Sequence, residues 1–159
     1  MSELEELNVL DVIDMKARYI LKEDIDLDDR VINIRGAITS KLLDKFNRSL
    51  TLLESLNSDG ITVMIHSPGG EVYSAFAIID RIQNSKCLVT TVGTGLVASA
   101  AIPILASGHI RKATRNVTMM YHEPSFNIPF DRLTSAEIET KHVKQLGQRL
   151  NKFMAESTN

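Results

Sequence analysis

The sequence predicts an α/β fold built from repeated strand–helix units around a mostly parallel sheet. Short apolar runs rich in β-branched residues alternate along the chain with longer segments in which apolar residues recur at intervals of three or four. Turns containing glycine, asparagine and serine separate these segments. Because a helix crosses over between one strand and the next, the strands are expected to run parallel with helices on both faces of the sheet.

The first strand–helix unit follows a polar, acidic arm, residues 1–29, which is expected to be partly mobile with at most one short helix. The stretch "RVINIRG" (30–36) alternates in polarity and ends at a glycine, which predicts a strand. Thr39 can then cap a helix. The apolar positions of that helix are Leu42, Phe46, Leu50, Leu53 and Leu56.

The next units continue the alternation to residue 121. The runs Ile61–Ile65 and Leu88–Val92 are predicted strands, and an amphipathic helix between Val72 and Ile82 connects them. The nearly all-apolar segment Ser99–Ala106 predicts a short buried helix, and Val117–Tyr121 predicts a fourth strand.

A long helix is predicted at the end of the chain. Residues 134–137, "TSAE", form a capping box, and a single stripe of mainly apolar side chains follows it. The stripe contains Ile138, His142, Leu146, Leu150, Phe153 and Met154. Such a helix, at about residues 134–156, can fold back on its own domain, or it can project and pair with a neighbouring chain.

Composition and charge limit the classes of function. The 159 residues are 43% hydrophobic and 24% charged, as in a single globular domain, and the net charge of −2 offers no basic surface to a nucleic acid. The longest apolar stretch, Leu96–Ala106, is too short to cross a membrane, and the acidic N-terminus lacks the apolar segment of a signal peptide. The single cysteine, Cys87, is expected to be a small buried residue at the start of a strand in a cytoplasmic protein.

Three motifs contain groups that can take part in a reaction. They follow successive predicted strands, at the edge of a parallel sheet where the active sites of α/β proteins are usually found. The turn in "HSPGGEV" (66–72) either simply ends a strand or exposes backbone N–H groups to an oxyanion. Ser99, at a strand-to-helix junction, is either a helix cap or a nucleophile. His122 is either structural or the base that a serine nucleophile requires.

The other histidines are weaker candidates for a base. His66 precedes the Pro-Gly-Gly turn, His109 lies in a predicted loop, and His142 lies in the stripe of the last helix. The surroundings of Ser99 do not match the G-x-S-x-G pattern, so the α/β-hydrolase fold is not the appropriate template.

Five stretches, in this order, resemble ClpP, the family of proteolytic subunits of the ATP-dependent Clp protease, within the crotonase-like superfamily. They are "RVINIRGAIT", "IHSPGGEVYSAFAIIDRI", "GLVASAAIPILASGHIRKA", "MMYHEP" and "IETKHVKQLGQRLNKFMAEST". The interval from Gly70 to Ser99 fits the family without a gap, and the interval from Ser99 to His122 is slightly short. The resemblance covers residues 30–159, which form a head (30–126) and the terminal helix.

The resemblance implies a role for each matching residue. Ser99 corresponds to the nucleophile, His122 to the general base, and Gly70 and Ala100 to the residues whose backbone N–H groups bind the oxyanion. It also implies that the glycine pair lets a substrate strand approach bare backbone, and that unfolded polypeptides bind as added strands. No metal or cofactor is implied for this chain.

The resemblance also implies partners and an assembly. A Clp-type AAA+ ATPase, which consumes the ATP, is expected to feed substrates to the chain. The terminal helix corresponds to the "handle" that interleaves two seven-membered rings into a barrel. Neither a nucleic acid nor a membrane is expected as a partner.

Departures from the family pattern keep alternatives open. Ala100 replaces the usual methionine, and Pro103 lies inside the predicted helix; if Ser99 caps that helix, Pro103 frees the Ser99 carbonyl. The family's third catalytic residue, an aspartate, and its final strand and helix correspond to positions beyond Asn159. Glu123 is a poor substitute for this aspartate, and Asp131, in the loop before the terminal helix, is a possible one. The alternatives are a non-catalytic or weakly catalytic subunit that modulates another ring, and a crotonase-type acyl-CoA enzyme.

Overall fold

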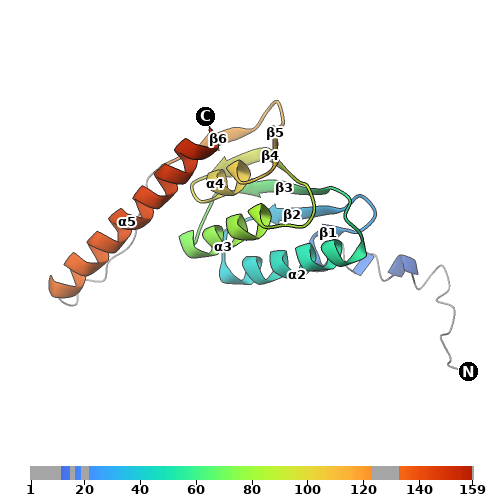
Figure 1. Ribbon diagram of the computed structural model, residues 1–159, viewed down its shortest axis with the longest axis horizontal. Helices are drawn as coiled ribbons and strands as arrows, with labels where there is room; N and C mark the ends of the chain where they lie inside the picture. Colours follow the sequence, from blue (N-terminus) through green and yellow to red (C-terminus); the bar gives the residue numbers. More distant parts are fainter. Residues whose placement is uncertain (1–11, 15–16, 19–21, 123–132, 159) are drawn as a thin grey trace, which may run out of the picture.

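The computed structural model describes residues 12–14, 17–18, 22–122 and 133–158, and its strands and helices alternate as the sequence predicts. In chain order the elements are β1 (Ile25–Asp26), β2 (Val31–Arg35), α2 (Ser40–Leu56), β3 (Ile61–Ser67), α3 (Val72–Gln83), β4 (Val89–Ala98), α4 (Ala101–Ala106), β5 (Ile110–Ala113), β6 (Thr118–Met120) and α5 (Leu133–Ser157). Figure 1 shows their arrangement.

The sheet is mostly parallel, as predicted. Its strands lie in the order β1-β2-β3-β4-β5, and β6 pairs with the far end of β4. The pairs β2–β3, β3–β4, β4–β5 and β4–β6 are parallel, whereas the pair β1–β2 is antiparallel. The carboxyl ends of β3, β4 and β6 therefore meet at one edge of the sheet.

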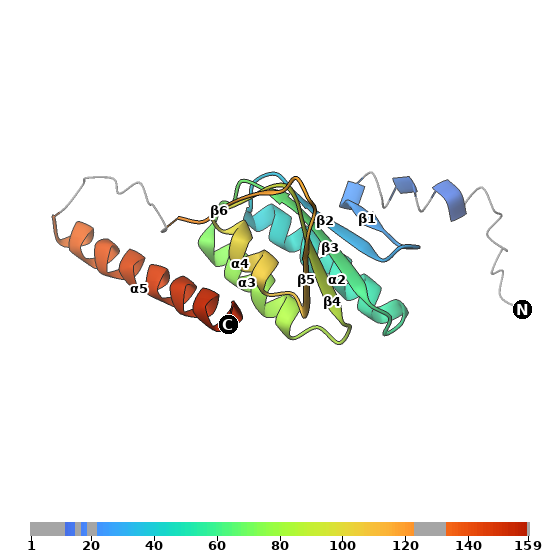
Figure 2. The same cartoon turned by 90° about the horizontal axis from the view of Figure 1, so that it is seen from above.

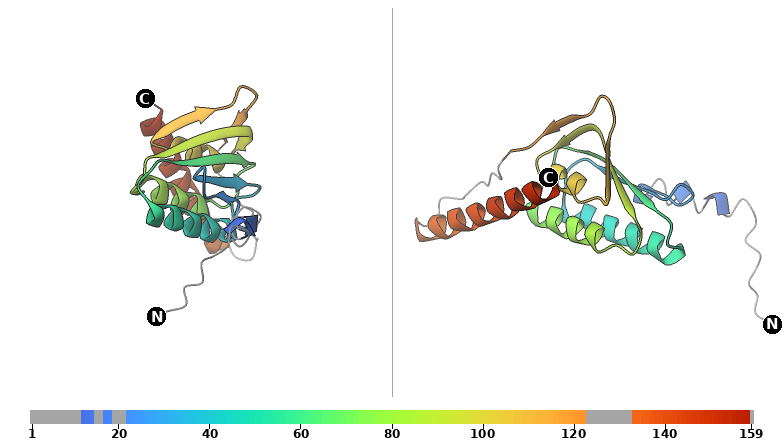
Figure 3. Two further views of the ribbon diagram at one scale, coloured as in Figure 1. Left: turned by 90° about the vertical axis from the view of Figure 1, so that its right-hand side faces the viewer. Right: turned by 45° about the horizontal axis from the view of Figure 1, so that its top comes forward.

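Helices cover one face of the sheet, which differs from the prediction that both faces are covered. In β2 and β3 fully buried residues alternate with half-buried or exposed ones, and only the buried set faces the core. Helices α2 and α3 lie side by side along that face (Figure 3). The core between these two helices and the sheet contains Phe46, Leu50, Leu53, Ile78, Ile79 and Ile82, each of which is at most 2% exposed.

Several boundaries are set by local chemistry. The hydroxyl oxygen of Thr39 accepts a hydrogen bond from the Leu42 N–H (3.2 Å), which confirms the predicted helix cap. Strand β4 continues to Ala98 although Gly93 and Gly95 resemble a turn in the sequence, because the strand after Gly95 pairs with β6. Helix α4 begins at Ala101, two residues later than predicted.

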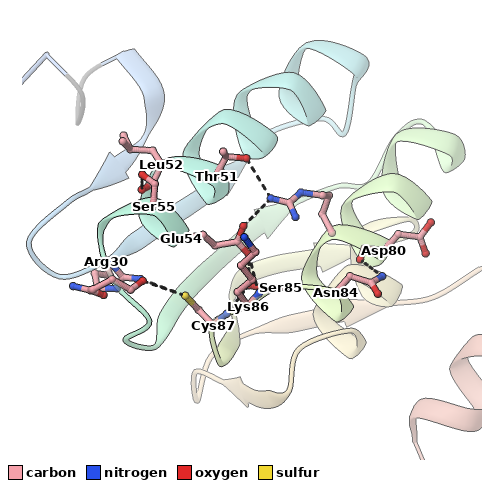
Figure 4. A network of polar contacts seen from close by, with 12 residues as sticks. Arg30, Thr51, Leu52, Glu54, Ser55, Asp80, Asn84, Ser85, Lys86 and Cys87 are labelled. Carbon is pink, nitrogen blue, oxygen red and sulfur yellow. Dashed lines mark hydrogen bonds and ion pairs between the residues drawn. The ribbon is translucent and has the colours of Figure 1, made fainter.

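Arg30, just before β2, binds the end of α2 and the loop between α2 and β3, and it also contacts Cys87 (Figure 4). The side chain is 7% exposed, and its guanidinium donates to the carbonyls of Leu53, Asn57, Asp59 and Gly60. A cation suits this position because the last carbonyls of a helix lack intrahelical donors. Its Nη2 also lies 3.6 Å from the sulfur of Cys87, which is buried as predicted.

Glu54 forms a second polar centre on the same helix (Figure 4). Its carboxylate accepts hydrogen bonds from the Ser85 hydroxyl (2.7 Å), the Lys86 N–H (3.1 Å) and the Arg81 guanidinium (3.2 Å). Burial would raise the pKa of Glu54, but these hydrogen bonds and the charge of Arg81 together hold the pKa below its ordinary value of 4.5. The network joins α2 to the turn between α3 and β4.

Helix α5 folds back on the domain along its C-terminal part and projects from it along its N-terminal part (Figure 1, Figure 2). Leu146 and Leu150 are buried, at 2% and 3% exposed. The Arg149 guanidinium lies 4.5 Å from the centre of the Phe76 ring of α3, and the His142 ring stacks on Tyr73 and hydrogen-bonds its hydroxyl. The side chain of Ile138 lies outside the described residues.

Within the described ranges, no helix has the length and apolar character that crossing a lipid bilayer requires.

Candidate active site

The glycine pair after β3 is required by the packing of the protein itself. Gly69 has φ +94°, and a Cβ built on it would lie 2.6 Å from Cβ of Ser99 and 2.9 Å from N of Ala100. A Cβ on Gly70 would lie 2.2 Å from the carbonyl oxygen of Ile38. Real side chains do not approach so closely. Glycine at 69 therefore leaves room for the turn that carries Ser99, and glycine at 70 leaves room for the connection between β2 and α2.

The N–H of Gly70 points away from that connection. The Ile38 N–H donates to the Gly69 carbonyl (2.8 Å), and the Glu71 N–H donates to the Ile38 carbonyl (2.9 Å), which together form an isolated parallel bridge. In such a bridge the residue between the two bonded neighbours directs its own N–H to the opposite side. The Gly70 N–H therefore faces the far side of the turn.

Ser99 has an unusual backbone conformation for a serine. Its φ is +54°, in the left-handed region that non-glycine residues seldom adopt. The Ser99 N–H donates to the Met120 carbonyl (2.7 Å), and its own carbonyl accepts from the Ile102 N–H (3.0 Å). The turn is thus held from both sides, which is the condition under which strain persists at functional positions.

The carbonyl of Ser99 is not freed by Pro103, in contrast to the expectation from the sequence. Because α4 starts at Ala101, Ser99 does not cap it, and the Ile102 N–H satisfies the Ser99 carbonyl. Among the described residues, the N–H groups of Gly70 and Ala100 donate to no backbone carbonyl. Their predicted role as oxyanion donors stays a prediction.

Ser99 and His122 line one small cavity. The bond between the Ser99 N–H and the Met120 carbonyl ties the end of β6 to the serine turn, and His122 follows two residues later. The cavity has a volume of about 10 Å³, and its lining consists of Val72, Ser99, Ala100, Pro103, Tyr121, His122 and Leu150. Of the four predicted site residues, Ser99, Ala100 and His122 line the cavity, and Gly70 lies in the adjacent glycine pair.

The remaining histidines have structural partners. Nδ1 of His66 accepts from the Leu96 N–H (3.1 Å), and Nδ1 of His109 accepts from the Val89 N–H (3.0 Å). His142 contacts Tyr73. None of the three lines the cavity at Ser99.

Sequence reasoning did not find four of the lining residues: Val72, Pro103, Tyr121 and Leu150. Tyr121 and Val72 adjoin predicted site motifs, so their proximity could have been inferred. Leu150 could not, because the stripe on α5 does not reveal which part of the domain it contacts.

A larger cavity, of about 370 Å³, lies elsewhere, between α4, β5, β6 and the end of α5. Its lining includes Arg111, Lys112 and Met119, but neither Ser99 nor His122. We place the candidate site at the smaller cavity because Ser99 and His122, the predicted nucleophile and base, both line it. Glu123 and Asp131 lie outside the described residues. Within the part of the chain that the structure describes, no three His, Cys, Asp or Glu side chains cluster as metal ligands would.

Comparison with known proteins identifies the class to which this fold and site belong. The Clp protease family model matches residues 17–159, which includes part of the segment predicted as an N-terminal arm. The chain therefore belongs to the Clp protease family.

Individual relatives agree with this assignment. The chain is 39% identical over 135 residues to ATP-dependent Clp protease proteolytic subunit 2 of Treponema denticola, covering 83% of this chain and 67% of the relative. It is 34% identical over 131 residues to proteolytic subunit 3 of Rhizobium meliloti, covering 81% of this chain and 67% of the relative.

Solved structures share the fold. ClpP1 from Listeria monocytogenes superposes with a TM-score of 0.73 at 35% identity, covering 83% of this chain and 74% of that one. A point mutant of the same protein gives a TM-score of 0.76 at 36% identity, with the same coverage. The mostly parallel sheet and the C-terminal helix are thus features of the ClpP fold.

Proposed function

We propose that the chain is a serine endopeptidase subunit of a compartmentalised, ATP-dependent protease that cleaves unfolded polypeptides. The observation that carries the proposal is the meeting of Ser99, held at φ +54°, and His122 at one cavity beside the glycine pair. Membership of the Clp protease family supports a peptidase.

The chemistry is acyl transfer. The Ser99 hydroxyl attacks the substrate carbonyl while His122 accepts its proton, and the backbone N–H groups of Gly70 and Ala100 stabilise the oxyanion. His122 then donates the proton to the leaving amine, which releases the first product. A water molecule, deprotonated by His122, attacks the acyl-serine ester and releases the second product.

This reaction requires no metal or cofactor of the chain itself. ATP is consumed by a separate Clp-type AAA+ ATPase that unfolds substrates in the cytoplasm. The projecting N-terminal part of α5 is suited to contact neighbouring subunits in stacked rings (Figure 2).

The alternative within the Clp protease family is a subunit that is weakly catalytic on its own and modulates another ring. Such a chain would still carry a reactive Ser99, but it would turn over peptides slowly.

Covalent labelling tests the proposal. A small alkyl fluorophosphonate reacts with activated serines, and intact-mass spectrometry should show one adduct on the wild-type protein and none on Ser99→Ala. An adduct of the same yield on Ser99→Ala would reject Ser99 as the nucleophile. Absence of any adduct on the wild-type protein would favour a non-catalytic subunit.

A further inference from the structure

Ser67, the last residue of β3, carries a buried hydroxyl that the proposed reaction does not use. The residue is 0% exposed, and its Oγ accepts a hydrogen bond from the Gly69 N–H (3.1 Å). Gly69 is also buried, whereas Gly70, the next residue, is exposed. A buried N–H without an acceptor is costly, so the hydroxyl of Ser67 favours one orientation of the Gly69 N–H over all others.

The carbonyl side of Gly69 is held by a second bond. The Ile38 N–H donates to the Gly69 carbonyl (2.8 Å). The peptide between Gly69 and Gly70 is trans, so its C=O and N–H point in opposite directions, and the bond to Ile38 directs the Gly70 N–H away from the connection between β2 and α2. Ser67 and Ile38 thus fix the peptide groups on either side of Gly69.

Two glycines in succession require such anchors. Gly69 and Gly70 have φ of +94° and +151°, and neither has a Cβ that limits rotation about its backbone bonds. If the hydroxyl of Ser67 is removed, the Gly69 N–H loses its acceptor, and φ of Gly69 can change. The plane of the next peptide, which contains the Gly70 N–H, then tilts.

Gly69 also contacts the turn that carries the predicted nucleophile. A Cβ built on Gly69 would lie 2.6 Å from Cβ of Ser99 and 2.9 Å from N of Ala100. The Gly69 backbone therefore lies directly against the residues that supply the nucleophile and the second predicted oxyanion donor. A change at Gly69 alters the distance between the two donors as well as the direction of the Gly70 N–H.

We propose that Ser67 is a positioning residue of the oxyanion-binding site. Its hydroxyl acts through Gly69, and it holds the N–H groups of Gly70 and Ala100 in the arrangement that a tetrahedral oxygen beside Ser99 requires. The inference rests on the proposed function, because it requires Ser99 to be the nucleophile and these two N–H groups to be the donors. It goes further by assigning a role to a buried side chain that does not line the cavity at Ser99.

The test compares two fluorophosphonates that differ in one atom, a P=O oxygen or a P=S sulfur. In both, the Ser99 oxygen attacks phosphorus, His122 takes the hydroxyl proton, and the P–F bond breaks to release fluoride. Aligned N–H donors stabilise the negative charge that develops on oxygen, whereas sulfur is larger and a weaker acceptor. Intact-mass spectrometry over time gives the ratio of the oxygen-probe rate to the sulfur-probe rate, and hydrolysis of both probes in buffer gives their intrinsic ratio.

The wild-type protein should show a ratio well above the intrinsic one. Ser67→Ala should lower the oxygen-probe rate by about 10- to 100-fold, because a small misplacement of an aligned group has effects of this size, and it should slow the sulfur probe much less. Ser67→Thr, which keeps the hydroxyl, should retain a ratio close to that of the wild type. An unfolded fraction of any variant reacts with neither probe, so it lowers both rates equally and leaves the ratio unchanged.

Ser107→Ala is the matched control. The Ser107 hydroxyl is similarly buried, at 5% exposed, and it donates to the Ile104 carbonyl (2.7 Å) at the end of α4. Its removal costs one buried hydrogen bond of the same kind away from the glycine pair. Ser107→Ala should therefore keep the wild-type ratio of labelling rates.

The outcomes separate the two claims. If the oxygen probe labels Ser99 but Ser67→Ala keeps the wild-type ratio, the positioning inference is wrong and the proposed function stands. The inference is also wrong if Ser107→Ala or Ser67→Thr lowers the ratio as much as Ser67→Ala does. If the oxygen probe fails to label the wild-type protein, the proposed function itself is wrong.

Discussion

At the scale of single residues, the packing around Ser99 fixes the backbone conformation of the predicted nucleophile. Its positive φ is held by bonds to Met120 and Ile102, and Gly69 fills the space beside it where no Cβ fits. The sequence predicted that Ser99 and His122 would meet, because both follow strands of one parallel sheet. It could not predict the left-handed turn, since one of the two bonds that hold it comes from Met120 at the end of a strand that is distant in the sequence.

The strain at Ser99 makes a prediction about stability. Ser99→Gly and Ser99→Ala both remove the hydroxyl, but only glycine adopts φ +54° without a steric penalty. We expect the free energy of unfolding of Ser99→Gly to exceed that of Ser99→Ala by about 1 kcal/mol, as measured by urea denaturation. Equal stabilities would show that the turn is unstrained.

Gly69 gives a second prediction at this scale. Gly69→Ala places a methyl group against Cβ of Ser99, so it should lower the free energy of unfolding by more than about 2 kcal/mol and slow fluorophosphonate labelling. Gly36→Ala is the control, because Gly36 also has positive φ (+75°) but nothing within 4 Å of a built Cβ. It should cost about 1–2 kcal/mol and leave labelling unchanged. Similar labelling rates in the two variants would show that Gly69 does not position Ser99 for reaction.

At the scale of elements, strands were harder to predict than helices. The apolar periodicity of α2, α3 and α5 is strong in the sequence, and all three were predicted. Strand β5, "IRKA", escaped prediction because all its residues are exposed and two are charged. Strand β1 has two residues and is ordered by pairing with β2, a tertiary interaction that the local sequence does not reveal.

The Glu54 network joins two of these elements and should make stability depend on pH. The pKa of the Glu54 carboxyl is lower in the folded protein than its ordinary value of 4.5. The carboxylate therefore stabilises the fold at pH values above 4.5, and this stabilisation is lost as the pH falls through the lower pKa of the folded state. Glu54→Gln should cost about 1–2 kcal/mol at pH 7, and the difference from wild type should shrink below pH 4.5.

Urea denaturation at several pH values measures this difference. Glu156→Gln is the control, because Glu156 forms an exposed pair with Lys152 (3.8 Å), and such pairs contribute little. A penalty for Glu54→Gln that is the same at pH 3.5 and pH 7 would contradict the assigned role of the carboxylate.

At the scale of the whole molecule, the order of elements in the sequence was sufficient to predict the α/β class and the parallel sheet. The expectation of helices on both faces was wrong for the described chain, since the strands alternate buried and half-buried residues. The sequence also left open whether α5 packs or projects. The structure shows both, in different parts of the helix, because α5 contacts the domain from His142 to Ser157.

The projecting part of α5 leads to a prediction about assembly. We expect ring-based oligomers, and stacked heptamers are the form that the resemblance implies. Light scattering at micromolar concentration should therefore give a mass many times that of one chain. A monomer under these conditions would contradict the assembly model.

Dependence on a partner follows from a chambered assembly. The purified chain should cleave short peptides at best, and degradation of a stably folded protein should require a Clp-type ATPase and ATP. Gel analysis with and without the ATPase distinguishes these cases. Rapid digestion of a folded protein by the chain alone would show that the active site is not enclosed.

The central claim is that His122 activates Ser99, and the rate of fluorophosphonate labelling tests it most directly. His122→Ala should lower the labelling rate by about 10²- to 10⁴-fold, the usual contribution of a positioned base. His109→Ala, which removes a histidine that bonds the Val89 N–H away from the cavity, should label at nearly the wild-type rate. A His122→Ala variant that remains folded by circular dichroism and labels as fast as the wild-type protein would contradict the claim.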